Sequence, residues 1–281
     1  MTGKQKTIKE RIELEDIGTF SGQRTRIVLC PADPGEGMHF AQISGGGESR
    51  IDCLTPLVVD SEKCTTLGNK DGARVLVVEH LLSAMYSLGV TNLRIEIHGP
   101  EVPLFDGGPE MFHQKALEAG LVEQEADTAE LTLAKPYMFQ DSGGFIVAFP
   151  AEEFRVSYLF EHPFDSRCMQ AVEVVIDDQT YRSELLKART WITDREAEIA
   201  LSSGMVKYGS PETTSTVVSK ASTSRPLNYD DELPRHKVVD IIGDLSLLGR
   251  RLKMHVIGVK SGHRFNHELA RKIWADNPLV S

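Results

Sequence analysis

Residues 78–99 read VEHLLSAMYSLGVTNLRIEIHG, and residues 238–258 read VVDIIGDLSLLGRRLKMHVIG. In both stretches apolar side chains recur at helical spacing up to a glycine, Gly89 or Gly249, and then alternate with polar residues as in a half-buried strand. Aligning the two glycines places His80 opposite Asp240. The pattern favours an internal duplication, although a helix, a glycine and a strand also occur in succession by chance.

The flanking sequence predicts the same kind of surroundings for both copies. Each copy is followed by a further helical pattern, over residues 109–120 and 265–275, and each is preceded by runs rich in β-branched or aromatic residues. Examples of these runs are 25–29, 145–149, 154–160 and 172–176. Such elements are typical of an α+β fold. We therefore expect two similar α+β domains, residues 1–126 and 127–281, each a sheet backed by two helices.

The composition is that of an ordinary globular protein. Hydrophobic residues make up 41% and charged residues 26% of the 281 residues. No apolar segment reaches the ~18 residues of a membrane span, and the charged N-terminus has no signal-peptide core, so the cytoplasm is the expected location. A net charge of -10 disfavours nucleic-acid binding. Four widely spaced cysteines without a C-x-x-C pair disfavour a disulfide framework and a cysteine-ligated zinc site.

Polar groups interrupt one face of the second apolar helix. His236, Asp240 and Asp244 are spaced i, i+4 and i+8, so they share that face. Because such groups are costly to bury unless they are paired or bind a metal, the spacing indicates either a metal site or an exposed, salt-bridged stripe. His80, at the start of the other helix, would supply a third ligand, and three protein ligands are usual for catalytic zinc.

Two further residues fit a metal site. Glu79 points about 100° around the helix from His80, so it would reach a water on the metal without being a ligand. A glutamate in the first turn is also explained by the helix dipole. His263 lies in the segment KSGH, residues 260–263, after the second strand. Such a histidine lies on a ligand-facing loop or on a loop that caps the next helix, and both readings stay open.

Five segments together resemble the UDP-3-O-acyl-N-acetylglucosamine deacetylases of lipid A biosynthesis. They follow the family's order over nearly the whole chain, and the fourth is highly specific. The segments are VEHL at 78–81, PEVPLFDG at 100–107, ARTW at 188–191, DELPRHKVVDIIGDL at 231–245 and KSGH at 260–263. The resemblance implies two α+β domains whose helices pack together between the sheets, with a zinc site at their junction.

The resemblance also implies a reaction and its residues. Zinc held by His80, His236 and Asp240 would serve hydrolysis of the N-acetyl group of UDP-3-O-acyl-N-acetylglucosamine, with release of acetate; iron(II) is an alternative occupant of such a site. Glu79 matches the general base. The other catalytic matches are His263 as the cation that stabilises the oxyanion and protonates the leaving amine, Asp244 as its hydrogen-bond partner, and Thr190 as a hydroxyl beside the oxyanion.

The substrate-binding matches follow from the same resemblance. Lys237 and Lys260 match lysines near the diphosphate, and Phe160 matches a uracil-stacking aromatic residue. Trp191 stands beside the sugar, where the family usually has phenylalanine. The acyl chain is expected to run among the apolar residues Ile192, Ile199, Leu201 and Met205.

Two positions on the nucleotide side depart from the family pattern. Phe20 replaces a histidine of the first-strand motif, and Leu159 replaces an acidic residue before the stacking aromatic residue. These changes bear on substrate identity rather than on hydrolysis. Two alternatives therefore stay open: a deacetylase of another N-acetylated sugar nucleotide or glycolipid, and a non-catalytic sugar-nucleotide binding protein. A monomer is expected.

Overall fold

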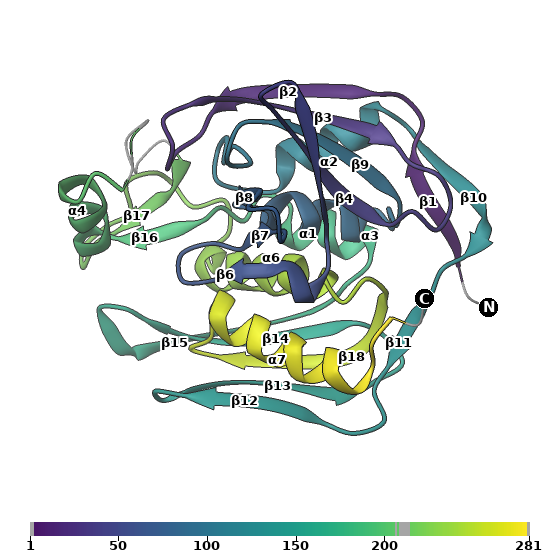
Figure 1. The fold of residues 1–281 in the computed structure, drawn as a ribbon. Coiled ribbons are helices and arrows are strands. Elements are labelled where there is room, and N and C mark those ends of the chain that lie inside the picture. The colour runs from purple at the N-terminus through teal and green to yellow at the C-terminus, as the bar shows by residue number, and fades with distance from the viewer. Residues whose placement is uncertain (1–2, 206, 208–213, 280–281) are drawn as a thin grey trace.

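The computed structural model describes residues 3–205, 207 and 214–279 (Figure 1). The elements up to residue 127 are β1 (Lys4–Ile8), β2 (Ile12–Ile17), β3 (Arg24–Pro31), β4 (Met38–Ser44), β5 (Gly47–Asp52), a short helical turn η1 (Thr55–Leu57), β6 (Val58–Asp60), β7 (Thr66–Gly68), β8 (Arg74–Leu76), α1 (Glu79–Ser87), β9 (Leu93–His98), α2 (Glu110–Glu118) and β10 (Leu121–Asp127). The later elements are β11 (Glu130–Thr132), β12 (Tyr137–Asp141), β13 (Gly144–Pro150), β14 (Arg155–His162), β15 (Asp165–Val175), α3 (Asp178–Thr180), a π-helical turn η2 (Tyr181–Leu185), β16 (Trp191–Thr193), α4 (Asp194–Ser202), β17 (Thr216–Val218), α6 (Glu232–Ser246), β18 (Arg251–Val259) and α7 (His263–Asp276).

The two main sheets have the same strand order. The first runs β2-β3-β9-β4-β5, and the second contains the path β12-β13-β18-β14-β15. In each sheet the strand that follows the long helix enters at the centre. In the first sheet, β9 is antiparallel to β3 and parallel to β4. In the second, β18 is antiparallel to β13 and parallel to β14. The α+β class predicted from the sequence is confirmed, and the repeat corresponds to two halves of equal topology.

Helices fill the space between the two sheets, and α1 packs along α6 (Figure 1). The cores of the halves interlock at this contact. Tyr86 of α1 belongs to the core of the second half, whereas Leu247, just after α6, belongs to that of the first. The boundary predicted after residue 126 stays a prediction; β10, which pairs with β1, ends one residue later, at Asp127.

Glycines shape both ends of this helix pair. Gly89 and Gly249 have φ values of 76° and 71°, the left-handed conformation that commonly follows a helix. Within α6, a Cβ on Gly243 would lie 2.1 Å from the carbonyl oxygen of Glu79. A side chain of any size at this position would therefore push α1 away from α6.

The two long helices differ at their N-termini. When Gly89 is aligned with Gly249, the first residue of α1 corresponds to residue 239, but α6 already begins at Glu232. The extension amounts to about two turns, and it carries His236 and Lys237. In the part of the chain that the structure describes, we find no helix with both the length and the apolar character needed to cross a membrane.

Candidate active site

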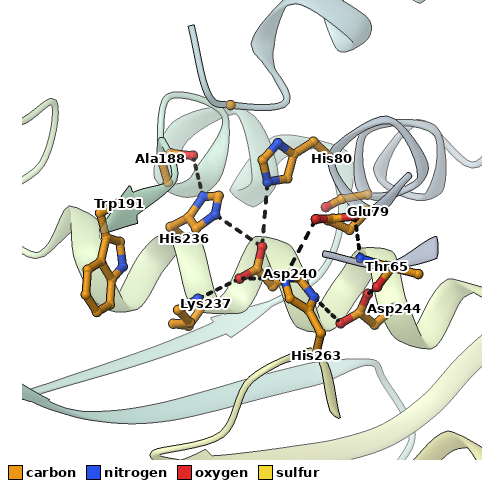
Figure 2. Close-up of polar contacts among 12 residues, drawn as sticks. Thr65, Glu79, His80, Ala188, Trp191, His236, Lys237, Asp240, Asp244 and His263 are labelled. Atoms are coloured by element: carbon orange, nitrogen blue, oxygen red, sulfur yellow. Dashed lines mark hydrogen bonds and ion pairs between the residues drawn. The ribbon is translucent and has the colours of Figure 1, made fainter. Parts of the chain in front are cut away.

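Three buried side chains from both halves meet where α1 begins beside the middle of α6 (Figure 2). His80 comes from α1, while His236 and Asp240 lie one turn apart on α6. One ligand atom of each residue lies within 4.8 Å of the others. The Oδ1 atom of Asp240 is 3.2 Å from Nε2 of His236 and 3.7 Å from Nε2 of His80. The structure thus brings together the three residues that the sequence analysis proposed as metal ligands.

The hydrogen bonds around these residues fit a metal ion. A carbonyl oxygen only accepts, so Nδ1 of His236 carries the proton that it shares with Ala188 O at 3.1 Å. Burial lowers the pKa of His236 and favours the neutral ring, although Asp240 opposes this. The lone pair on Nε2 then faces Asp240 Oδ1, which has no hydrogen-bond donor among the described residues. Two electron-rich atoms this close repel each other when buried, unless a cation lies between them.

The second carboxylate oxygen of Asp240 is held by a lysine. Lys237 Nζ donates to Oδ2 at 2.9 Å and also lies 5.5 Å from the centre of the Trp191 ring. Burial acts to raise the pKa of Asp240, but the positive charges of Lys237 and His263 hold it well below its usual range. Asp240 is therefore a carboxylate at neutral pH, as a metal ligand must be.

Glu79 and His263 face each other beside the ligand group. Glu79 Oε1 lies 3.7 Å from His263 Nε2, which is 3.9 Å from Asp240 Oδ2. Burial raises the pKa of Glu79 to about 7, although His263 opposes the rise. Burial acts to lower the pKa of His263, but Asp244, Asp240 and Glu79 raise it to about 10. A carboxylate that accepts a proton near neutrality thus stands next to an imidazolium that can donate one.

Asp244 connects His263 to residues that the sequence analysis missed. Its Oδ2 accepts hydrogen bonds from His263 Nδ1 and Asn266 Nδ2, both at 2.8 Å. Its Oδ1 accepts one from Thr65 Oγ1 at 2.5 Å and lies 3.3 Å from His267 Nε2. His267 follows His263 by four residues on α7, a spacing that indicates a shared helix face. Thr65 lies between β6 and β7, where no periodicity marks it.

A cleft of about 350 Å³ opens onto the site. Most of the residues predicted for catalysis and metal binding line it: Glu79, His80, Thr190, His236, Asp240 and His263. Trp191, Lys237 and Phe20 also line it, as do three of the four apolar residues predicted for the acyl chain, Ile192, Ile199 and Met205. The backbone of Thr190 is fixed on both sides, since its N–H donates to Gly107 O and its carbonyl accepts from Thr216 N, each at 2.8 Å.

Other predicted substrate residues lie elsewhere. Phe160 is buried with its ring 5.4 Å from that of Trp191, and Lys260 forms an ion pair with Glu161. Neither Phe160 nor Lys260 is among the described residues that line the cleft. Leu201 does not line it either, and 54% of its surface is exposed. Leu159 is on the surface. Their roles in substrate binding stay predictions.

The comparisons with known proteins agree with this geometry. The family described as UDP-3-O-acyl N-acetylglycosamine deacetylase matches residues 5–275. A protein of Myxococcus xanthus (strain DK1622), named UDP-3-O-acyl-N-acetylglucosamine deacetylase, is 37% identical over 276 residues, which are 97% of this chain and 87% of the relative. Relatives of the same name from Syntrophotalea carbinolica and Chlamydia pneumoniae are 33% and 32% identical, over 97% and 96% of this chain and 88% and 96% of their own lengths. The chain therefore belongs to the UDP-3-O-acyl N-acetylglycosamine deacetylase family.

Proposed function

We propose that this protein is a zinc-dependent hydrolase that removes the N-acetyl group from UDP-3-O-acyl-N-acetylglucosamine and releases acetate, the committed step of lipid A biosynthesis. One observation carries the proposal. In a chain of this family, a buried group of three metal-ligand side chains lies next to a base and a cationic acid at the end of one cleft. We further propose that the enzyme is a cytoplasmic monomer.

The donor set supports zinc as the metal. Two imidazole nitrogens and one carboxylate oxygen are a common ligand set for catalytic zinc, which keeps its fourth position open for reactants. His236 also shows the usual outer hydrogen bond of a ligand, from Nδ1 to the Ala188 carbonyl. Metal analysis of the purified protein distinguishes zinc from iron(II), which the same ligands hold.

The proposed mechanism assigns one proton transfer to each flanking residue. A zinc ion held by His80, His236 and Asp240 would polarise the amide carbonyl and make a neighbouring water more acidic. Glu79 accepts the proton of the attacking water through Oε1, the oxygen that faces His263. His263, held by Asp244 through Nδ1, presents Nε2 to the cleft, neutralises the developing oxyanion and then protonates the leaving nitrogen. The C–N bond breaks, leaving acetate and the free amine of the sugar.

The remaining cleft residues are assigned to the substrate. The Thr190 hydroxyl donates to the oxyanion. Lys237 places a positive charge beside Trp191, where the sugar and the diphosphate of the substrate would meet it. Ile192, Ile199 and Met205 offer an apolar wall to the acyl chain.

Paired substitutions test the assignment of base and ligands. Glu79→Gln keeps the metal but lowers kcat by about 10²–10⁴-fold, the usual contribution of a general base. His80→Ala loses the metal along with the activity. Glu118→Gln, at an exposed glutamate on α2, is the matched control and leaves both unchanged. Zinc content and acetate release are measured on the same preparations, and full turnover by Glu79→Gln would rule out Glu79 as the base.

One observation favours a second candidate substrate. Because Phe160 is buried and Lys260 is paired with Glu161, two residues predicted for the nucleotide lie away from the cleft. The chain could thus act on another N-acetylated sugar nucleotide or glycolipid. Turnover of acylated and non-acylated UDP-N-acetylglucosamine separates the two. A strong preference for the acylated compound supports the lipid A substrate, and equal turnover rejects it.

A further inference from the structure

Thr65 contacts both Glu79, the proposed base, and Asp244, the partner of the proposed acid His263, from a loop that no motif marks. Its backbone N–H donates to Glu79 Oε2 at 3.1 Å, and its carbonyl accepts from Val78 N at 3.3 Å. The start of α1 is therefore fixed from both sides by the backbone of one residue. Because Oε2 of Glu79 is occupied in this way, Oε1 is the oxygen left to face His263.

The side chain of Thr65 points to Asp244 of α6 (Figure 2) and also reaches His267 of α7. Its Oγ1 donates to Asp244 Oδ1 at 2.5 Å and lies 2.7 Å from His267 Nε2. Since the single hydroxyl proton goes to the carboxylate, the hydroxyl oxygen accepts from Nε2–H of His267. Thr65, Asp244 and His267 are almost completely buried, so water does not replace any of these bonds.

We propose that Thr65 is a positioning residue that aligns the base and the acid of this reaction with each other, through its N–H to Glu79 and its hydroxyl to Asp244. This inference rests on the proposed deacetylase function. The hydroxyl fixes Oδ1 of Asp244, so that Oδ2 stays in the plane where His263 Nδ1 meets it. Held in this way, His263 keeps Nε2 directed at the cleft. His267 supports the threonine and is a second positioning residue.

The chain offers a closely matched pair of variants. Thr65→Val removes the hydroxyl but keeps the shape and the N–H to Glu79, and Thr65→Ser restores the hydroxyl. Thr66→Val is the control, since Thr66 is also buried but, among the described residues, its hydroxyl has Cys64 Sγ, at 3.9 Å, as its hydrogen-bond partner. Thr65→Ala also removes the hydroxyl, with a smaller side chain, and replaces Thr65→Val if the valine variant does not fold.

Kinetics on the metal-loaded enzyme give the first readout. Thr65→Val is expected to lower kcat by about 10-fold or more, the order of one hydrogen bond to a charged group, with KM within twofold of the wild type. Thr65→Ser and Thr66→Val stay near the wild type. If the hydroxyl acts through Asp244 and His263, Thr65→Val costs less than twofold when His263→Ala is already present. An equal loss in both backgrounds overturns the proposal.

Proton NMR without substrate gives the second readout. The Nδ1 proton that His263 shares with Asp244 has a downfield resonance, identified by its disappearance in His263→Ala. Thr65→Val or Thr65→Ala should shift this resonance, and Thr66→Val should leave it in place. An unshifted resonance overturns the positioning role. Absence of turnover by the wild type rejects the proposed function instead, because the resonance is observed whatever the substrate is.

Discussion

Replacement of Gly243 by alanine tests the contact that brings the two halves together. The added Cβ would lie 2.1 Å from the carbonyl oxygen of Glu79 and 3.0 Å from its Cα, so α1 must move by about 0.9 Å before the nearest distance reaches 3.0 Å. Alanine in a helix is favoured over glycine by about 1 kcal/mol, whereas overpacking costs about 1–3 kcal/mol. We expect the free energy of unfolding to fall by up to about 2 kcal/mol.

The effect on catalysis should be larger than the effect on stability. Glu79 and His80 move with the start of α1, and a displacement near 1 Å costs about 100-fold in rate. Urea denaturation and kcat for acetate release measure the two effects. Gly47→Ala is the control, because its nearest neighbour would be 3.8 Å away and its φ is not positive. A Gly243→Ala enzyme with wild-type kcat and stability would refute the close-contact argument.

Three further predictions concern metal, charge and pH. A chelator should lower the thermal midpoint of the wild type but not of His80→Ala, because the metal binds only the folded state; equal shifts contradict the ligand assignment. Arg189→Met removes the guanidinium that lies 2.7 Å from the buried Glu232 carboxylate, which keeps the backbone N–H groups of residues 189 and 228 as donors. This loss should cost about 3 kcal/mol in urea denaturation; an unchanged midpoint contradicts this. Burial lowers the pKa of His113, although Asp178 opposes this decrease. Below about pH 6.5 the unfolded chain therefore binds a proton that the folded protein does not, and the free energy of unfolding falls as the pH falls. His113→Phe lacks this loss, so from pH 7.5 to pH 5.5 its free energy of unfolding should fall less than that of the wild type. Both proteins are measured without metal, and parallel curves would show that His113 does not titrate in this way.

Periodic segments with a clear end were the most predictable parts of the fold. The helix expected from residue 78 is α1, and the alternating run at 93–97 lies within β9. In these segments burial of one face and the terminal glycine both follow from local sequence. The meeting of His80 with Asp240 followed from aligning Gly89 with Gly249, and the structure places the two side chains in contact.

Residues whose position depends on tertiary structure were beyond such reasoning. Thr65 reaches Asp244 across 179 residues of sequence, from a loop without any repeat pattern. Phe160 faces inward because its strand, β14, packs that face against Trp191, which alternation alone does not specify. His236 was found by its spacing from Asp240, but only the structure shows that it lies on an N-terminal extension of α6.

The contact between α1 and α6 would make the retention of a bound metal ion a measure of how the two halves pack against each other. Of the three described side chains that could hold a metal ion together, His80 belongs to the first half, and His236 and Asp240 belong to the second. Coupling free energies are reciprocal, so an ion that favours the closed contact is itself held more tightly when that contact is closed. An ion bound at this site would hold the two halves together. A change far from the cleft that loosens the interlocking cores, at Tyr86 or Leu247, should therefore first become visible as faster metal loss.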